Sequence, residues 1–182
     1  MALVKSIAGN EICDTVARNA QVGGRNYITR SARLEDFGVE ASRATFKNQV
    51  FTRSSGSAGS NYGIYKDAPL TAKAGDNLTL SVDVADIFGT MRIGLCETNQ
   101  LTYPWNDAVK NITTNGRHSI SVNFTGSCTI RVYIASNEAG TTCKLSNVKL
   151  ERGNKATDWT PALEDTLTMT DDNNGNVTIS IL

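Results

Sequence analysis

Apolar and polar side chains alternate strictly between Asn77 and Val84. The apolar positions of this segment are Leu78, Leu80, Val82 and Val84. Successive side chains of a β-strand point to opposite faces of a sheet, so this pattern predicts a strand with one buried face. A helix would bring apolar residues together every three or four positions, and this segment does not do so. The chain must therefore contain a sheet that buries one of its sides.

The same alternation recurs through the middle of the chain. It covers residues 91–95, 120–124, 128–134 and 145–150, and more weakly residues 27–30, 50–53 and 62–65. In the 145–150 segment the register breaks near Ser146-Asn147, which predicts a β-bulge. Glycine-containing turns such as Asn115-Gly116 separate the segments. Short alternating strands with no helical pattern between them predict an all-β fold, an antiparallel two-sheet jelly-roll sandwich.

The two ends of the chain differ from this middle part. Residues 10–20 have a helical pattern with Ile12 and Val16 on a narrow apolar stripe, and Gly23-Gly24 follows it. Near the other end, Asn174-Gly175 between two alternating segments predicts a β-hairpin. We therefore expect three parts: an N-terminal anchor with a short helix over 1–23, a sandwich over 24–165, and a C-terminal β-hairpin over 166–182.

Both end segments are too small to bury their own apolar side chains. The N-terminal stripe is expected to dock on another protein or another copy, and we expect a homo-oligomer, either a dimer or a trimer. For the hairpin two interpretations stay open. It covers an edge of the sandwich, or it joins a neighbouring subunit by strand addition.

The charge balance restricts the partners. The chain of 182 residues has 18 basic and 18 acidic side chains, and this zero net charge argues against binding to nucleic acid through bulk positive charge. No apolar run approaches the roughly 20 residues that span a bilayer, so we expect no membrane insertion. The N-terminus lacks the apolar stretch of a secretion signal, and we expect synthesis in a cytosol.

Cysteine spacing and sequence motifs argue against a zinc site and against an enzyme. The four cysteines show no C-x-x-C spacing, and there is one histidine. Cys128 and Cys143 follow the alternation of their strands, so we expect buried thiols, with a disulfide between them as the alternative. The chain has no G-x-S-x-G, phosphate-loop or G-x-G-x-x-G motif, and we predict neither an enzyme nor a cofactor.

Aromatic residues lie beside short polar residues in two segments. One segment contains Tyr103, Trp105, Asn106 and Asp107, and the other contains Tyr62 and Tyr65. Flat rings stack on the apolar faces of sugars, while amides and carboxylates pair with sugar hydroxyls. These six residues are therefore candidate glycan contacts. The alternative is that the rings cap the core or lie in a contact between subunits.

Residues 149–165 read KLERGNKATDWTPALED. This segment places a Gly153-Asn154 turn before Trp159 and Pro161, and it resembles the closing motif of carbohydrate-binding-module-like jelly-roll domains in bacteriophage tail, fibre and other virion structural proteins. GRNYITRS at 24–31 and LTLSVDV at 78–84 resemble the opening and the central strand of the same domains. In such a motif we expect Trp159 to close the end of the sandwich as a structural plug and Pro161 to fix the direction of the exit.

The resemblance implies a virion fibre protein, attached to the head or the tail, that is made in the host bacterial cytoplasm. It implies contacts with other virion proteins through the N-terminal segment and with host-surface or mucosal glycans through the sandwich. The alternative is a structural decoration or assembly protein of the virion without glycan binding. Members of the resembled family often carry a structural calcium near the first and last strands, where Glu151 is the candidate ligand, joined by Asp36 or Glu40.

Overall fold

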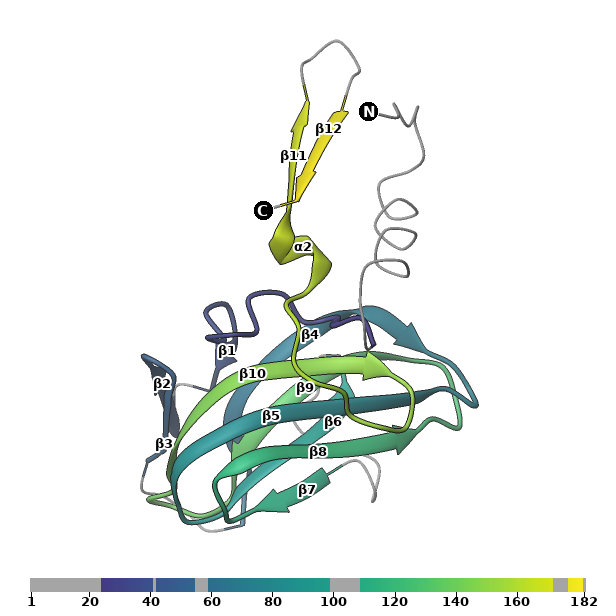
Figure 1. Cartoon of the computed structure of the whole chain (residues 1–182). Coiled ribbons are helices and arrows are strands. Elements are labelled where there is room, and N and C mark those ends of the chain that lie inside the picture. Colours follow the sequence, from purple (N-terminus) through teal and green to yellow (C-terminus); the bar gives the residue numbers. More distant parts are fainter. Residues whose placement is uncertain (1–23, 41, 55–58, 99–108, 172–176, 182) are drawn as a thin grey trace.

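Two five-stranded antiparallel sheets face each other in the computed structural model (Figure 1). It describes residues 24–40, 42–54, 59–98, 109–171 and 177–181, and for residues 167–171 and 177–181 the backbone alone. Sheet A contains, in spatial order, β1 (Gly38–Val39), β4 (Tyr62–Ala72), β9 (Cys128–Ser136), β6 (Met91–Glu97) and β7 (Val109–Ile112). Sheet B contains β2 (Ala44–Lys47), β3 (Val50–Arg53), β10 (Thr142–Arg152), β5 (Asn77–Phe88) and β8 (Gly116–Asn123). The predicted all-β fold, a jelly-roll sandwich, is confirmed.

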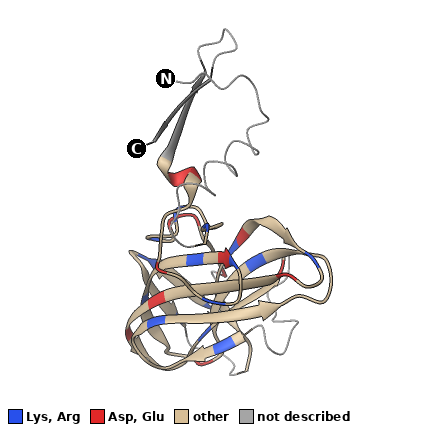
Figure 2. Cartoon of the chain, turned by 45° about the vertical axis from the view of Figure 1, so that its right-hand side comes forward, with Lys and Arg blue, Asp and Glu red and all other residues tan. Residues whose placement is uncertain are grey.

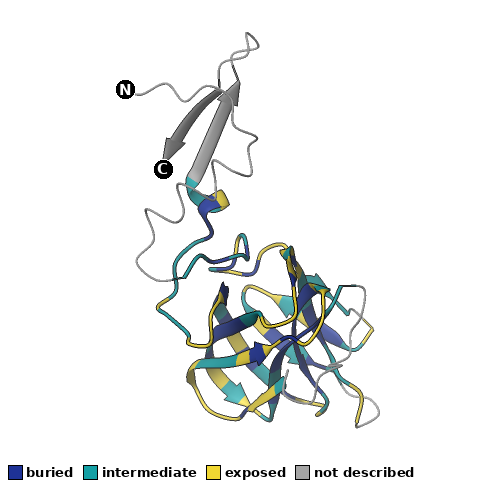
Figure 3. Ribbon diagram, turned by 90° about the vertical axis from the view of Figure 1, so that its right-hand side faces the viewer, coloured by how far each residue is buried: buried dark blue, intermediate teal, exposed yellow. Residues whose placement is uncertain are grey.

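The core lies between the sheets and is built from the alternating positions. Leu78, Leu80 and Val82 of β5 have no exposed surface, and they pack with Ile93 of β6 and Ile130 of β9 in one apolar cluster. Figure 3 shows that buried residues are spread along the strands of the sandwich. Burying an aliphatic side chain of this size contributes about 1.5–3 kcal/mol, so the sequence pattern and the main stabilising contacts coincide.

A β-bulge lies in β10 where the sequence predicted it. The pairing of β10 with β5 shifts register between Ser146 and Lys149, and Asn147 has a φ of 53°. Because of the extra residue, Val148 and Leu150 both reach the core although Leu145 already faces it. The apolar face of the strand therefore stays continuous across the break.

The expected weak strand over residues 27–30 is absent, and this prediction was wrong. The amide of Tyr27 donates to the carbonyl of Leu150 at 2.9 Å, as a strand would. The return bond, however, goes from the Leu150 amide to the side-chain Oδ1 of Asn26 at 3.2 Å, and Oδ1 also accepts from the Ile28 amide. The asparagine side chain thus replaces a backbone partner and ends the ladder after one bond. Strands β1, β2 and β7 were not predicted because they are short edge strands with little alternation.

The C-terminal hairpin forms a sheet of its own. After the short helix α2 (Leu163–Thr166), β11 (Leu167–Asp171) pairs with β12 (Val177–Ile181), with Leu167 opposite Ile181 and Met169 opposite Ile179. This sheet joins neither five-stranded sheet, and it stands away from the sandwich (Figure 1). Its pairing with a neighbouring subunit stays a prediction. The N-terminal anchor with Ile12 and Val16 lies outside the described residues.

Charges of both signs are spread over the two sheets, and α2 is acidic through Glu164 and Asp165 (Figure 2). Within the described ranges, no helix has the length and apolarity to cross a bilayer. Cys96, Cys128 and Cys143 are free thiols, so the alternative of a Cys128–Cys143 disulfide does not hold. Cys143 is buried in the core, and Cys128 is half-buried against it, as the alternation predicted.

Candidate functional site

The side of sheet A that faces away from the core carries aromatic and charged side chains, and we call it the outer face of sheet A. Its central cross-strand row runs from Gly38 through Tyr65 and Tyr133 to Gly94. The Tyr65 ring lies over Gly38, because a Cβ added there would come within 2.5 Å of the ring carbon Cζ. Glycine at this position therefore leaves the space that the ring occupies.

Arg131, Asp67 and Tyr65 form one constellation on this face. Arg131 and Asp67 are cross-strand neighbours on β9 and β4, and the guanidinium binds both carboxylate oxygens, with Nε–Oδ1 at 2.6 Å and Nη2–Oδ2 at 3.0 Å. The same guanidinium lies 4.4 Å from the centroid of the Tyr65 ring. Hydrogen bonding to Asp67 raises the pKa of Arg131 above its usual range. The Asp67 side chain is 47% exposed, so this fixed carboxylate is open to solvent.

A carboxylate supports the tyrosine at the centre of the row. Glu40 Oε2 accepts from the Tyr133 hydroxyl at 2.5 Å and from the Gly63 amide at 2.7 Å. Tyr133 has no exposed surface and packs with Cys96 and Ala135 in a second apolar cluster, against which Tyr65 also packs. Burial raises the pKa of the Cys96 thiol to about 12. The outer face thus has an apolar, fixed centre beneath its half-buried Tyr65.

A second arginine lies towards the other end of the same face. Arg92 of β6 is half-buried and donates from Nη1 to the side-chain oxygen of Asn61 at 3.1 Å. Arg92 pairs across the sheet with Ala135, a member of the second apolar cluster. Polar side chains therefore flank this cluster along the strands, with Arg131 and Asp67 on one side and Arg92 and Asn61 on the other. The half-buried ring of Tyr65 beside fixed donors and acceptors forms a surface that can recognise a ligand with both apolar and hydroxyl-bearing sides.

The predicted site residues do not all lie together. Tyr65 lies on the outer face of sheet A, whereas Tyr62 packs against the main core, with the Arg53 guanidinium 4.5 Å from its ring centroid. An odd spacing along a strand puts two side chains on opposite faces, so the three-residue separation already indicated this. The candidates Tyr103, Trp105, Asn106 and Asp107 lie outside the described residues, in the segment between β6 and β7 of sheet A.

The charged members of this face were not among the predicted site residues. Asp67 and Arg131 are 64 residues apart, and they meet only because β4 pairs with β9 in one particular register. A signal was present for β9, in which Arg131 and Tyr133 alternate with the core residues Ile130, Val132 and Ile134. Large polar side chains on the outward positions of a predicted strand are thus a usable pointer to such a face.

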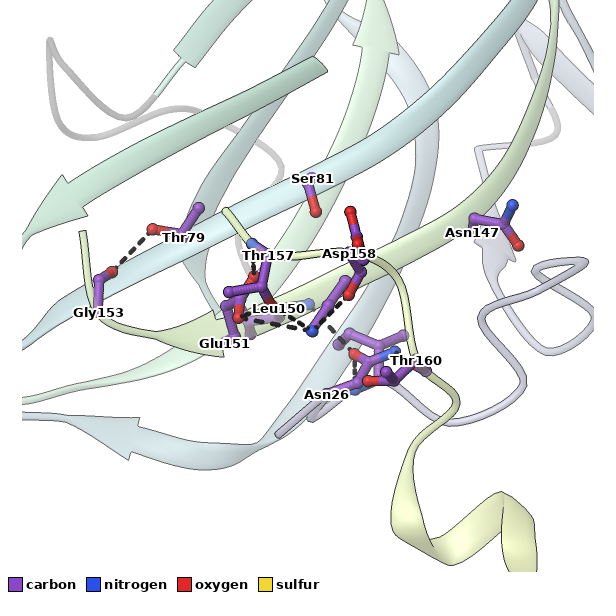
Figure 4. A network of polar contacts seen from close by, with 12 residues as sticks. Asn26, Thr79, Ser81, Asn147, Leu150, Glu151, Gly153, Thr157, Asp158 and Thr160 are labelled. Carbon is purple, nitrogen blue, oxygen red and sulfur yellow. Dashed lines mark hydrogen bonds and ion pairs between the residues drawn. The ribbon is translucent and has the colours of Figure 1, made fainter. Parts of the chain in front are cut away.

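Residues 153–161 follow β10, and we call them the exit motif. This segment lies over the outer side of β10 and buries a polar network (Figure 4). Lys149 Nζ donates to Thr157 Oγ1 at 2.7 Å and to the Asp158 carbonyl at 2.8 Å, and it lies 3.5 Å from Glu151 Oε2. Glu151 in turn accepts from the amide and the hydroxyl of Thr157. Burial lowers the pKa of Lys149, and the nearby Glu151 opposes this shift. The network holds the exit segment to the last strand of the sandwich.

This network does not fit a calcium site. Calcium takes about six to eight oxygen ligands, whereas Glu151 is paired with the ammonium of Lys149. Asp36 forms an ion pair with Lys66, and Glu40 binds Tyr133 and Gly63, so the three carboxylates have separate partners. In the part of the chain that the structure describes, no three or more His, Cys, Asp or Glu residues gather in a metal-binding group.

The remaining residues of the exit motif have structural contacts. Gly153 has a φ of 111°, in the region that favours glycine, and its amide donates to the Asn77 carbonyl. Asn154 is exposed and Pro161 is half-buried. Trp159 is half-buried, and its indole nitrogen donates to the Ser31 hydroxyl at 3.2 Å, which ties the exit to the opening segment.

Comparisons with known proteins gave matches among solved structures alone. No protein-family model and no curated protein matches the chain. The apo structure of BiXyn10A CBM1 matches with 14% identity over 71% of this chain and 99% of that chain, at a TM-score of 0.45. The structure of TmCBM61 in complex with beta-1,4-galactotriose matches with 13% identity over the same shares, at a TM-score of 0.39. The strand order and registers of this chain define its jelly-roll fold.

Proposed function

We propose that the sandwich is a non-catalytic glycan-binding module whose ligand contacts the outer face of sheet A. The observation that carries this proposal is the stack of the Arg131–Asp67 pair on the half-buried ring of Tyr65. The Asp67 carboxylate accepts from sugar hydroxyls and the guanidinium donates to ring or hydroxyl oxygens, while the Tyr65 ring, one face of which the guanidinium covers, supplies apolar contact from its remaining exposed surface. All three groups sit on paired strands rather than on loops.

Prior ordering of these groups favours binding. Arg131 is held by two bonds to Asp67 and by the Tyr65 ring, so little side-chain freedom remains to be lost when a ligand arrives. An open sheet face with one aromatic ring gives weak affinity at a single site. Several copies on one particle raise the overall affinity through effective concentration.

The setting that we propose is a bacteriophage virion, in which the chain is a head- or tail-attached fibre that binds host-surface or mucosal glycans. Support comes from the resemblance of residues 149–165, 24–31 and 78–84 to phage virion proteins. The N-terminal segment would attach the chain to other virion proteins, and the chain would form a dimer or trimer. Mass spectrometry of purified particles tests this setting, and consistent absence of the chain from particles contradicts it.

One observation favours the second candidate function, a decoration or assembly protein without glycan binding. The β11–β12 hairpin stands away from the sandwich as a separate two-stranded sheet (Figure 1). A lone hairpin is marginally stable in water, so pairing with another chain would stabilise it. Both functions are compatible with a hairpin that joins copies, and they differ in whether the outer face of sheet A binds a glycan.

A glycan array followed by calorimetry distinguishes them, using wild type, Asp67→Asn and Asp83→Asn. Asp83 forms the same kind of cross-strand pair, with Arg117 at 2.9 Å on sheet B, and is the matched control. We expect Asp67→Asn to weaken glycan binding about tenfold, as for the loss of one charged hydrogen bond, and Asp83→Asn to leave it unchanged. A wild-type protein that binds no glycan, or equal affinities for all three proteins, overturns the proposed site.

A further inference from the structure

A cavity of about 390 Å³ lies at the edge of the sandwich, away from the outer face of sheet A. It is bounded by the turn between β2 and β3 and by residues 33–35, which precede β1. Its floor is apolar: Leu34 is buried, and the half-buried ring of Phe46 packs against the main core. Cavities of this size accommodate small ligands such as one or two sugar residues, for which pockets run from about 300 Å³ upward.

The rim of this edge pocket carries charged side chains that are not paired with one another or with neighbours. Arg33, Glu35 and Lys47 are all exposed, and within the described ranges none of their side chains has a hydrogen bond or an ion pair. The next residue along the chain, Asp36, is by contrast neutralised by Lys66. Two cations and one anion are therefore free to contact a ligand, and their sum favours a negatively charged one.

The turn between β2 and β3, which forms one wall of the pocket, has two residues with backbone strain. Asn48 and Gln49 connect the paired residues Lys47 and Val50, and both have positive φ, 51° and 66°. A two-residue hairpin turn of this kind favours Asn-Gly, so Asn48 is an ordinary choice, whereas Gln49 occupies the position where glycine is easiest. Leu34 on the opposite wall also has a positive φ, of 55°. Backbone strain of this kind gathers at functional sites.

The contacts of the Gln49 side chain within the chain are too weak to explain why a non-glycine residue occupies this strained position. Its Nε2 lies 3.5 Å from the carbonyls of both Ala32 and Leu145, at the outer limit for hydrogen bonds, whose usual N–O distance is about 2.9–3.0 Å. The amide thus keeps capacity to donate to and accept from a ligand. Glycine would give a less strained turn, so the position retains a side chain that the turn itself does not need.

We propose that the edge pocket binds a sugar residue that carries a carboxylate. Lys47 and Arg33 would pair with the carboxylate, the amides of Asn48 and Gln49 with ring hydroxyls, and Phe46 with the apolar side of the ring. The site shares no residue with the proposed glycan contacts Tyr65, Asp67 and Arg131. It adds recognition of acidic glycans and does not depend on the function proposed for the outer face of sheet A.

Amide NMR titration of the full chain with glucuronic acid, with glucose as the uncharged control, tests this proposal. We expect shifts confined to residues 33–35 and 46–49 with glucuronic acid, and at least about fivefold weaker binding of glucose, since a charged hydrogen bond is lost. Lys47→Ala should weaken glucuronic acid binding about fivefold, and Lys73→Ala, an exposed lysine in another turn, should not. Added salt should weaken binding, because the charges are exposed.

Gln49→Gly separates binding from folding. We expect this variant to unfold at a higher denaturant concentration, because the turn is relieved, and yet to bind glucuronic acid several-fold more weakly. Unchanged binding by Lys47→Ala and Gln49→Gly, equal shifts with glucose, or no shifts at residues 33–35 and 46–49 would each overturn the proposal. Loss of glucuronic acid binding in Asp67→Asn would move the ligand to the outer face of sheet A and overturn it as well.

Discussion

The guanidinium of Arg131 lies 4.4 Å from the ring centroid of Tyr65 while two of its nitrogens bind the carboxylate of Asp67. A lysine at this position has one point-like ammonium, which cannot bind both oxygens side by side or stack as a plane. We therefore expect Arg131→Lys to weaken glycan binding about tenfold, as for loss of one charged hydrogen bond. The free energy of unfolding should fall by about 1 kcal/mol or less, because Asp67 is half-exposed.

Arg117→Lys is the control for this prediction, because Arg117 also forms a cross-strand ion pair, with Asp83 on sheet B, through one nitrogen and without a stacked ring among the described residues. Calorimetry with the glycan found on the array gives the affinities, and urea unfolding gives the stabilities. Equal affinities for Arg131→Lys and Arg117→Lys would contradict a role for the stacked guanidinium in binding.

The Tyr133 hydroxyl gives a second prediction, which concerns stability. Tyr133→Phe removes the hydroxyl that donates to Glu40 Oε2, so this carboxylate oxygen loses one hydrogen bond. The amide of Gly63 still donates to it. A hydrogen bond to a charged group contributes about 1.5–3 kcal/mol, so the free energy of unfolding should fall by an amount in that range. Urea denaturation measures it. Tyr62→Phe is the control, because no hydrogen bond of the Tyr62 hydroxyl is found among the described residues, and an equal loss there would contradict the assignment.

The alternation of side chains was sufficient to predict the fold, for a physical reason. Each central strand, such as β5, buries one full face. Apolar residues are therefore required at every second position of its sequence. The bulge near Asn147 was visible for the same reason, since Leu145, Val148 and Leu150 must all reach one core. Segments that bury few side chains do not show this alternation. Strand β1 has two residues, and the ladder at Tyr27 ends because of one asparagine side chain.

The candidate site was less predictable, because it depends on register. Asp67 and Arg131 face each other only when β4 and β9 pair as they do, and the composition of either strand does not specify the other's position. Tyr65 was found as an aromatic residue among polar neighbours, but grouping it with Tyr62 ignored the period of the strand. Three residues of the edge pocket, Leu34, Asn48 and Gln49, have positive φ. Of these, only Asn48 is of a residue type that predicts this conformation from sequence.

The thiols give a third prediction, through their different burial. Burial raises the pKa of Cys96 and of Cys143 to about 12, so at pH 8 almost none of either is the reactive thiolate. Cys128 is half-buried and also has a raised pKa, but solvent reaches it. Among the three cysteines in the part of the chain that the structure describes, we expect iodoacetamide to alkylate Cys128 first, and Cys96 and Cys143 only after unfolding in urea. Peptide mass spectrometry identifies the sites, and early alkylation of Cys143 would contradict its place in the core.

The buried pair of Lys149 and Glu151 gives the last prediction. Neither side chain is more than 1% exposed, and Lys149 Nζ lies 3.5 Å from Glu151 Oε2. Lys149→Met leaves Glu151 buried without its cation, which typically costs about 3–5 kcal/mol of stability. The double variant Lys149→Met/Glu151→Leu should recover part of this loss, because no unpaired charge is left. Urea unfolding of the four proteins in this cycle measures the coupling, and additive losses would contradict it.

The same pair has a pH dependence whose sign follows from the pKa of Lys149. Burial holds this pKa below the ordinary lysine value of 10.5, so the unfolded chain binds the proton more tightly than the folded chain. The cost of burying the ammonium is fully present at neutral pH, and it is relieved as the pH rises through the folded-state pKa towards 10.5. The stability advantage of wild type over Lys149→Met should therefore grow in this alkaline range. An advantage that shrinks as the pH rises would mean that the Lys149 pKa is raised, and that attraction to Glu151 outweighs burial.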